Sequence, residues 1–182
     1  MKKLLVILAV VIFLGATLAM SQPVPGKKFE LGTSLSFTSL KFSGSSGSDT
    51  VFVLPVRFGY FVWKGLEIEP EVMITSFDPG DVGFNLSGNV AYHFKVSGRL
   101  VPFVLAGVGV GNGFTAGLTV YEQTDASAFL INGGVGAKYV IGNVAAFRAE
   151  YRYTHNRLSK GGGLLIQNLN IHQVLVGLSI FF

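Results

Sequence analysis

The chain closes with Ile171-His172-Gln173-Val174-Leu175-Val176-Gly177-Leu178-Ser179-Ile180-Phe181-Phe182, and the architecture can be worked out from this stretch. Neighbouring side chains of a β-strand point to opposite faces. One face here is large and mostly apolar, while the other mixes small, polar and apolar groups. The first face consists of His172, Val174, Val176, Leu178, Ile180 and Phe182. A strand with this contrast predicts an apolar medium on its outer side.

The N-terminus has the pattern of a secretory signal peptide. Met1-Lys2-Lys3 precedes an apolar run over residues 4–14, and small residues follow over 15–21. A charged start, an apolar core and a small-residue exit are typical of such signals. An N-terminal membrane helix is the alternative, but the run is shorter than the roughly 20 residues that a span needs.

Cleavage is expected after Ala19 or Ser21, so the predicted domains are a signal peptide over 1–21 and one barrel domain over 22–182. The mature part, about 160 residues, has the length of a single domain. The signal contains two of the 14 basic residues, which leaves 12 against 10 acidic ones. This near balance gives no indication of a nucleic-acid partner.

The composition is unusually apolar for a chain without a spanning helix. Charged residues make up 13%, hydrophobic residues 49%, and 24 residues are glycine. Soluble domains have about 25% charged residues. After the signal no run reaches the ~18 apolar residues of a transmembrane helix. Because only helices and closed barrels satisfy the backbone in lipid, the composition favours a transmembrane barrel.

Eight amphipathic stretches predict the strands of an all-β, eight-stranded antiparallel up-and-down transmembrane β-barrel. The expected strands are 29–41, 50–62, 66–77, 82–94, 100–111, 127–140, 144–154 and 171–182. Their lengths suit tilted spans of 9–11 residues. Pro55 predicts a bulge or irregularity, since proline cannot donate to a ladder. The facing of 100–111, which is rich in Val-Gly repeats, stays ambiguous.

The connections between these strands predict the orientation. Long or flexible connections are expected at 43–49, 111–125 and 155–168, and most of the others are short. Outer-membrane barrels have longer extracellular loops and short periplasmic turns. We therefore expect both ends of the mature chain on the periplasmic side.

The predicted lumen contains both signs of charge. Three carboxylates at alternate positions of 66–77 cannot face lipid, so they mark the inner face. The inward charged residues are Glu30, Glu67, Glu69, Glu71, Glu150, Arg57, Lys138, Arg148 and Arg152, with His93 beside them.

An eight-stranded barrel is only wide enough for side chains to fill it, which predicts a structural ion-pair network. A conducting or catalytic lumen is the alternative, but neighbouring arginines favour ionised carboxylates and so disfavour a poised general acid. A lipocalin-like soluble barrel would need more surface charge than the chain has.

Two segments carry a resemblance that extends over most of the mature chain. Residues 98–109 and Glu150-Tyr151-Arg152-Tyr153 resemble the small OmpA/OmpX-type outer-membrane barrel superfamily, and the last strand resembles the C-terminal strand of such barrels. The resemblance implies an integral protein of a Gram-negative-type cell outer membrane, with a structural or surface-interaction role through its loops. It also implies outer-membrane lipid and lipopolysaccharide as partners, and Phe182 as a signal for the barrel assembly machinery.

A weaker resemblance points to outer-membrane lipid A deacylases, which have a His-x-Ser motif at the end of the penultimate strand. Here His155 stands in that place, with Ser159 and Asn170 as candidate nucleophile and orienting residue. The position two residues after His155 is Arg157 rather than serine. An inert barrel, a lipid A ester hydrolase and a small pore therefore remain distinct hypotheses.

No cofactor or metal is expected. The chain has no cysteine, its three histidines lack ligand spacing, and its Gly-rich strands lack the helix of a phosphate loop.

Overall fold

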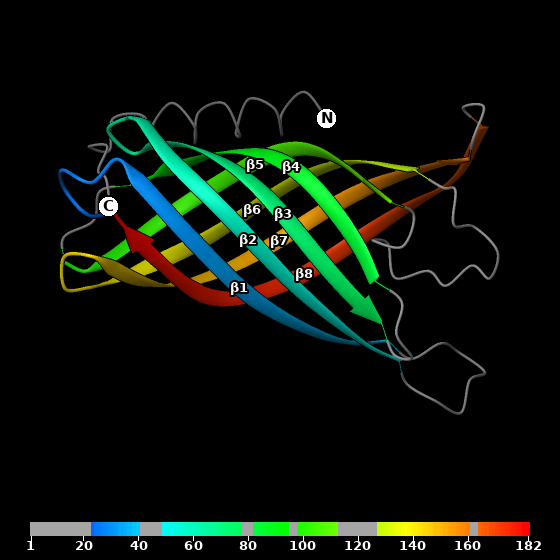
Figure 1. The fold of residues 1–182 in the computed structure, drawn as a ribbon, viewed down its shortest axis with the longest axis horizontal. Coiled ribbons are helices and arrows are strands. Elements are labelled where there is room, and N and C mark those ends of the chain that lie inside the picture. Colours follow the sequence, from blue (N-terminus) through cyan, green and yellow to red (C-terminus); the bar gives the residue numbers. More distant parts are fainter. Residues whose placement is uncertain (1–22, 41–48, 78–81, 95–97, 113–126, 161–163) are drawn as a thin grey trace, which may run out of the picture.

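The computed structural model describes residues 23–40, 49–77, 82–94, 98–112, 127–160 and 164–182, which form one closed antiparallel barrel (Figure 1). The strands are β1 (Phe29–Leu40), β2 (Asp49–Trp63), β3 (Leu66–Phe77), β4 (Val82–His93), β5 (Leu100–Asn112), β6 (Ser127–Ile141), β7 (Ala145–Lys160) and β8 (Leu164–Phe181). Each strand pairs with the next, and β8 pairs with β1. The predicted fold class is confirmed. Among the described residues, no helix is both long and apolar enough to cross a membrane.

The seam between β1 and β8 closes the barrel. It runs from the pair Glu30–Phe181 to the pair Leu35–Val176. Beyond it, Phe29 and Phe182 each donate a backbone hydrogen bond of 3.0 Å to the other. Closure leaves no exposed strand edge, which a lipid environment requires because water cannot satisfy the backbone there.

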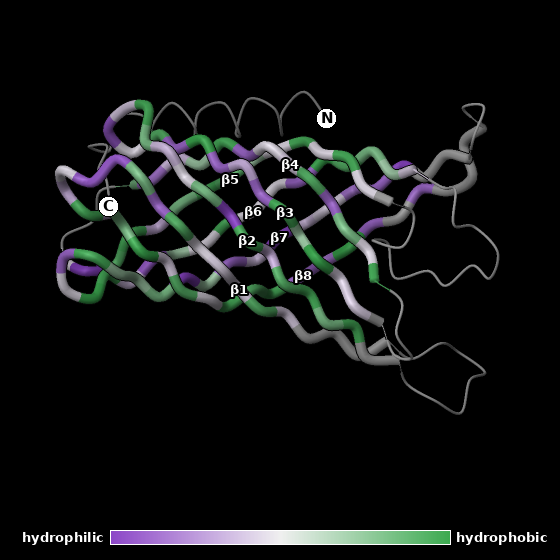
Figure 2. Tube along the Cα trace, viewed as in Figure 1, coloured by the Kyte–Doolittle hydropathy of each residue, from purple (hydrophilic) through white to green (hydrophobic). Residues whose placement is uncertain are grey.

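The barrel has most of its charged side chains inside and most of its large apolar side chains outside, which is the reverse of a soluble barrel. Glu69 and Arg148 are buried inside, whereas Phe84 is 57% exposed and Val174 is 64% exposed on the outside. The alternation of hydrophilic and hydrophobic residues along the strands is visible in Figure 2. The lipocalin-like alternative is therefore wrong.

The two ends of the barrel differ, and we name them by their connections. The "turn end" has the short connections β2–β3 and β6–β7 and the C-terminus; the "loop end" is the opposite one (Figure 1).

Six of the eight predicted strands agree with the structure to within one residue at each end. The proposed signal peptide lies outside the described residues, as do residues 43–48 of the predicted loop 43–49 and most of the loop 111–125, whereas Asp49 begins β2.

The predicted long loop over 155–168 is wrong. β7 continues to Lys160 and β8 begins at Leu164, so only residues 161–163 separate them. The two strands stay paired through Arg157–Asn168 to Lys160–Leu164, with one register shift between Leu158 and Ser159. The polar sequence here no longer alternates with apolar residues, yet backbone pairing alone continues the ladder.

The sequence predicts a bulge or an irregularity at Pro55, and the structure has an irregularity without a bulge. The β1–β2 ladder lacks the two pairs that would join Ser34 and Leu35 to Pro55 and Leu54. The pairing of β2 with β3 runs through Pro55 without a shift, and the register with β1 is the same on both sides of it. The Pro55 carbonyl accepts a hydrogen bond of 3.2 Å from the Thr33 hydroxyl. The register shift on this strand lies instead between Phe61 and Trp63, next to the β2–β3 turn.

The facing of β5, which the sequence left open, follows from burial. Val101, Phe103 and Leu105 are buried in the lumen, while Val104 and Val108 are exposed on the outside.

Candidate functional site in the barrel lumen

The nine charged residues predicted for the lumen all lie inside the barrel and form ion pairs with one another. They come from β1, β2, β3, β6 and β7, so the network spans the barrel cross-section. An inward glycine makes room for it: a Cβ on Gly59 would lie 1.7 Å from Glu67 Oε1. The small residue on β2 thus allows the carboxylate of β3 to extend toward the centre of the lumen.

Lys138 neutralises a cluster of three carboxylates. Its Nζ lies 2.5 Å from Glu30 Oε2, 3.0 Å from Glu67 Oε2 and 3.7 Å from Glu69 Oε1. Carboxylate oxygens of these three residues lie within 4.8 Å of one another, as in a metal site. The Lys138 ammonium occupies the position that a cation would need, so the residues present fit an internal ion pair better than a metal ligand set.

Three aromatic rings, those of Phe61, Phe103 and Phe181, surround this ammonium group at the turn end, and we call them the aromatic floor. The rings of Phe61, Phe103 and Phe181 have their centroids 5.8, 5.6 and 5.9 Å from Lys138 Nζ. The Phe103 centroid is also 4.4 Å from the Arg148 guanidinium carbon. Cations are attracted to ring faces at such distances. Sequence reasoning missed this floor, although Phe61 shares the inward parity of Arg57 and could have been assigned to the lumen.

Arg148 joins the Lys138 cluster to the middle of the lumen. It donates two hydrogen bonds to the Glu69 carboxylate, at 2.7 and 3.1 Å. It donates two more to Glu150 Oε2, at 2.8 and 3.0 Å. Bidentate pairing of a guanidinium with a carboxylate is both strong and geometrically specific.

Arg152 repeats this arrangement one step nearer the loop end. It donates to both oxygens of Glu71, at 2.5 and 3.1 Å, and to Glu150 Oε1 at 2.6 Å. Arg57 Nε donates to Glu71 Oε2 at 3.2 Å, and its Nη1 is 3.9 Å from Glu150 Oε2. Glu150 therefore lies among three guanidinium groups.

Five carboxylates face four permanent cations in this network. His93 is the further titratable group: its Nε2 lies 3.5 Å from Glu67 Oε2, and its Nδ1 lies 3.2 Å from the Gly65 carbonyl. The imidazole thus meets the carboxylate cluster that has the largest excess of negative charge. A proton shared in this region would balance the lumen.

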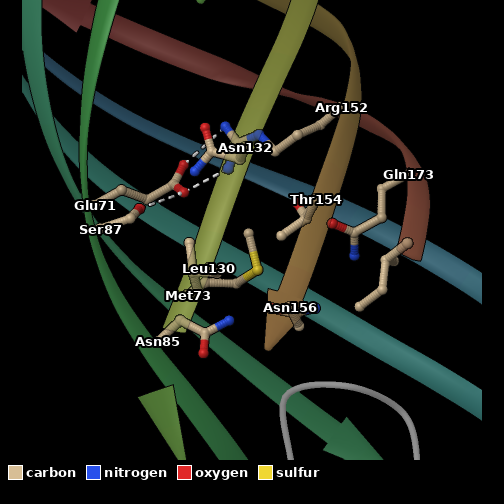
Figure 3. Close-up of a pocket in the computed structure, with 11 residues that line it drawn as sticks. Glu71, Met73, Asn85, Ser87, Leu130, Asn132, Arg152, Thr154, Asn156 and Gln173 are labelled. Carbon is tan, nitrogen blue, oxygen red and sulfur yellow. Dashed lines mark hydrogen bonds and ion pairs between the residues drawn. The ribbon is translucent and has the colours of Figure 1, made fainter. Parts of the chain in front are cut away.

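The loop-end half of the lumen contains amides, hydroxyls and apolar side chains, among them the buried cluster of Val51, Val53 and Met73. A cavity of about 20 Å³ lies next to the Glu71–Arg152 pair, and both residues are part of its lining (Figure 3). Its lining includes Asn85, Asn132, Asn156 and Gln173, which Figure 3 shows around the space. The side-chain oxygens of Asn85, Asn132 and Asn156 are buried and have no hydrogen-bond partner among the described residues. A space of this size admits about one water molecule.

Two of the three candidate catalytic residues, His155 and Asn170, have side chains on the outside of the wall, away from the lumen. His155 of β7 and Asn170 of β8 are paired across the two strands, and His155 Nδ1 lies 2.7 Å from Asn170 Oδ1. Ser159 belongs to β7, not to a loop. Strand positions four residues apart are separated by about 13 Å, so the structure does not bring Ser159 to the histidine. Of the three candidates, the structure brings together His155 and Asn170.

Phe182 lies at the turn end, where the seam closes. Its ring stacks on Phe29 with a centroid distance of 5.8 Å and lies 6.4 Å from Phe58. The side chain is 54% exposed on the outer face. It therefore extends the apolar wall at the last residue.

Comparison with known proteins gives the same architecture. The sequence model of the family described as outer membrane protein beta-barrel domain matches residues 6–182. Among solved structures, Neisserial surface protein A has a TM-score of 0.62 at 14% identity and covers 85% of this chain and 97% of its own. The N-terminal β-barrel domain of Pseudomonas aeruginosa OprF has a TM-score of 0.55 at 16% identity and covers 86% and 98%. A de novo designed transmembrane β-barrel has a TM-score of 0.55 at 14% identity and covers 90% and 100%. A search of curated protein sequences found no match.

Proposed function

The chain belongs to the outer membrane protein beta-barrel domain family and is an outer-membrane β-barrel protein, and we propose that it acts through its outer surface while its lumen stays closed. In this proposal the loops at the loop end face outward and meet partners. The barrel is their support and does not conduct solutes. The observation that carries the proposal is the buried ion-pair network across the lumen.

The energetics of the network favour a permanently closed lumen. Glu69, Arg148 and Lys138 are fully buried, and Glu69 Oε1 lies 2.7 Å from Arg148 Nη1 and 3.7 Å from Lys138 Nζ. Taking an ion out of water costs several kcal/mol unless a well-placed partner compensates it. Opening a path would separate partners that face each other from β3, β6 and β7. Side chains that fill an eight-stranded barrel leave no continuous aqueous channel.

Single-channel recording in planar bilayers tests closure. The mature barrel is expected to give no conductance steps, and Glu69→Gln is expected to give none or only irregular openings. Arg99→Gln, at an exposed turn-end arginine, is the matched control. Regular steps in the unmodified protein whose size changes with Glu69→Gln but not with Arg99→Gln would support a pore and contradict this proposal.

Export and assembly complete the proposal. A signal peptide over 1–21 would direct the chain across the inner membrane, and Phe182 would be read by the assembly machinery before β1 and β8 pair. The intact mass of the protein from outer membranes is expected to correspond to cleavage after Ser21 or Ala19. Removal of Phe182 is expected to lower the amount of assembled barrel, measured by heat-modifiable gel migration. A full-length mass, or normal assembly without Phe182, would contradict this part.

A lipid A deacylase is the second candidate, because the His155–Asn170 pair has the geometry of a base and its orienting residue. Ester hydrolysis would need a nucleophile beside His155, and Arg157 stands where the motif has serine. The test is the mass of lipid A from expressing cells. We expect no change, whereas loss of one acyl chain that His155→Ala abolishes would favour the enzyme.

A further inference from the structure

A group of polar side chains interrupts the apolar outer wall on two neighbouring strands. This "polar patch" consists of Tyr151, Tyr153, His155 and Arg157 on β7 with Asn170 and His172 on β8. All of them point outward, on the same face as Val174 and Val176. Three contacts join the strands: Tyr151 Oη–His172 Nδ1 at 2.5 Å, Tyr153 Oη to Asn170 Oδ1 at 2.8 Å, and His155 Nδ1–Asn170 Oδ1 at 2.7 Å.

The rest of the described outer wall has no such group. On the strands, where side chains are described, imidazole, guanidinium and carboxamide groups point outward only on β7 and β8. The neighbouring β6 stays apolar at the same level, because Ile131 pairs with His155 and Phe129 pairs with Arg157. Both are about half exposed, at 48% and 46%. The polar patch therefore adjoins a wall built for an apolar medium.

The level of the patch corresponds to the boundary of the membrane. A tilted strand crosses the hydrocarbon core in 9–11 residues, a length that β7 covers between Ala145 and His155. Tyr153 thus lies at interfacial depth, where tyrosine is enriched with its hydroxyl toward the headgroups, and Tyr151 lies just inside the span. His155 and Arg157 lie level with the headgroups themselves.

The chemistry of the patch suits an anion with further hydrogen-bonding groups. Arg157 is exposed, and no carboxylate among the described residues lies within ion-pair distance of it. The planar guanidinium matches phosphate geometry. Tyr153 and the two imidazoles add hydroxyl and ring nitrogen groups within the same patch. Anionic groups at this depth are the phosphates of the surrounding lipid.

We propose that the polar patch on β7–β8 binds the phosphate-bearing headgroup of a lipid in the leaflet at the loop end. This inference rests on the proposed orientation, in which the loop end is extracellular, so the occupant would be a phosphorylated glycolipid of the outer leaflet. Its acyl chains would lie along the apolar wall below the patch, over Val174, Val176 and Leu178.

Native mass spectrometry of the folded barrel in detergent tests the inference with three probes: diphosphorylated lipid A, the same lipid with its phosphates removed, and inorganic phosphate. The patch variant combines Tyr153→Phe, Arg157→Gln and His172→Phe. The matched control combines Tyr139→Phe and Arg99→Gln, an exposed tyrosine and arginine at the turn end. The patch variant is expected to bind diphosphorylated lipid A at least tenfold more weakly than the unmodified barrel, and the control is expected to bind it unchanged.

Three outcomes would overturn the inference: equal binding of the phosphorylated and dephosphorylated lipids, an equal loss in the control variant, or competition by inorganic phosphate as strong as that of the lipid. Heat-modifiable migration of each variant shows separately whether the barrel is folded. If the patch variant and the control variant lost lipid binding equally, the inference would be wrong, but the proposed closed barrel would be unaffected. An unmodified chain that does not fold into membranes would instead contradict the proposed function.

Discussion

The two halves of the lumen differ in the polar groups that they bury: one contains ion pairs and the other contains amides. At the turn end and in the middle, Lys138, Arg148 and Arg152 pair with carboxylates at 2.5–3.1 Å. Toward the loop end, carboxamides surround a small cavity, and those of Asn85 and Asn132 leave oxygens unpartnered. An unpaired buried ion is far more costly than an unpaired amide. Both halves contain buried polar atoms without a hydrogen-bond partner, among them Glu67 Oε1 in the charged half. The halves differ in that the ion pairs lie in the charged half, whereas the amide half has a cavity that admits about one water molecule.

The largest expected effect comes from removing one cation of the charged half. Arg148→Met leaves Glu69 and Glu150 without their bidentate donor. Breaking a buried ion pair from one side costs about 3–5 kcal/mol. We expect a loss of that size in the free energy of unfolding, measured by urea titration of the barrel in lipid vesicles.

The double variant Arg148→Met/Glu69→Met is the control for this prediction. Removing both partners restores the balance of charge and replaces the pair with apolar groups, which is often nearly neutral. The double variant should therefore be more stable than Arg148→Met alone. A double variant at least as unstable as the single one would mean that the lumen does not depend on charge pairing.

The next largest loss of stability is expected from adding a side chain at Gly136, next to Phe103 in the charged half. A Cβ on Gly136 would lie 2.5 Å from the Ala149 carbonyl oxygen and 2.5 Å from Phe103 Cζ. Phe103 would have to move away from the Arg148 guanidinium that it supports. Overpacking of this kind typically costs about 1–3 kcal/mol, so Gly136→Ala should lower the urea midpoint.

Gly133→Ala on the same strand is the matched control. Its Cβ would meet only the Leu105 carbonyl oxygen, at an ordinary 3.8 Å. We expect little change, or a small gain because the unfolded chain loses freedom. If both variants lowered the urea midpoint equally, β6 would disfavour any added side chain, and the contact with Phe103 would not explain the loss.

The parts of this structure that the sequence predicts are those in which lumen and lipid impose opposite demands. Glu67, Glu69 and Glu71 alternate with Ile68 because one side must pair charges and the other must face acyl chains. That contrast identifies the strands and their facing. It fails at the loop end, where Arg157 and Asn168 pair although the residues around them do not alternate between polar and apolar types. The sequence therefore predicts a loop where β7 and β8 in fact extend.

Individual partners within the lumen could not be predicted in the same way. The inward parity of Lys138 and Glu30 follows from their strands, but their contact at 2.5 Å depends on the register of the whole closed sheet. The same holds for His155 and Asn170, which only the β7–β8 register places opposite each other. Composition indicates which groups must pair, and the register decides which of them do.

A smaller effect is expected in the amide half of the lumen. Asn132→Leu removes a buried side chain whose oxygen has no partner, so it sacrifices little hydrogen bonding. Replacing an unsatisfied polar group with an apolar one of similar shape can be nearly neutral. We expect the free energy of unfolding to change by less than about 1 kcal/mol. A loss as large as that of Arg148→Met would erase the distinction between the two halves.

The smallest expected effect is that of Tyr151→Phe on the outer wall. This change removes the hydroxyl that contacts His172 Nδ1 but keeps the ring, which is 46% exposed. Exposed substitutions usually change stability by no more than about 0.5 kcal/mol. Urea unfolding in vesicles of neutral lipid should therefore match the unmodified barrel, whereas vesicles with phosphorylated glycolipid should reveal a difference. A large loss in neutral lipid would mean that the wall contact is structural, and that the polar side chains there serve the barrel more than the lipid beside it.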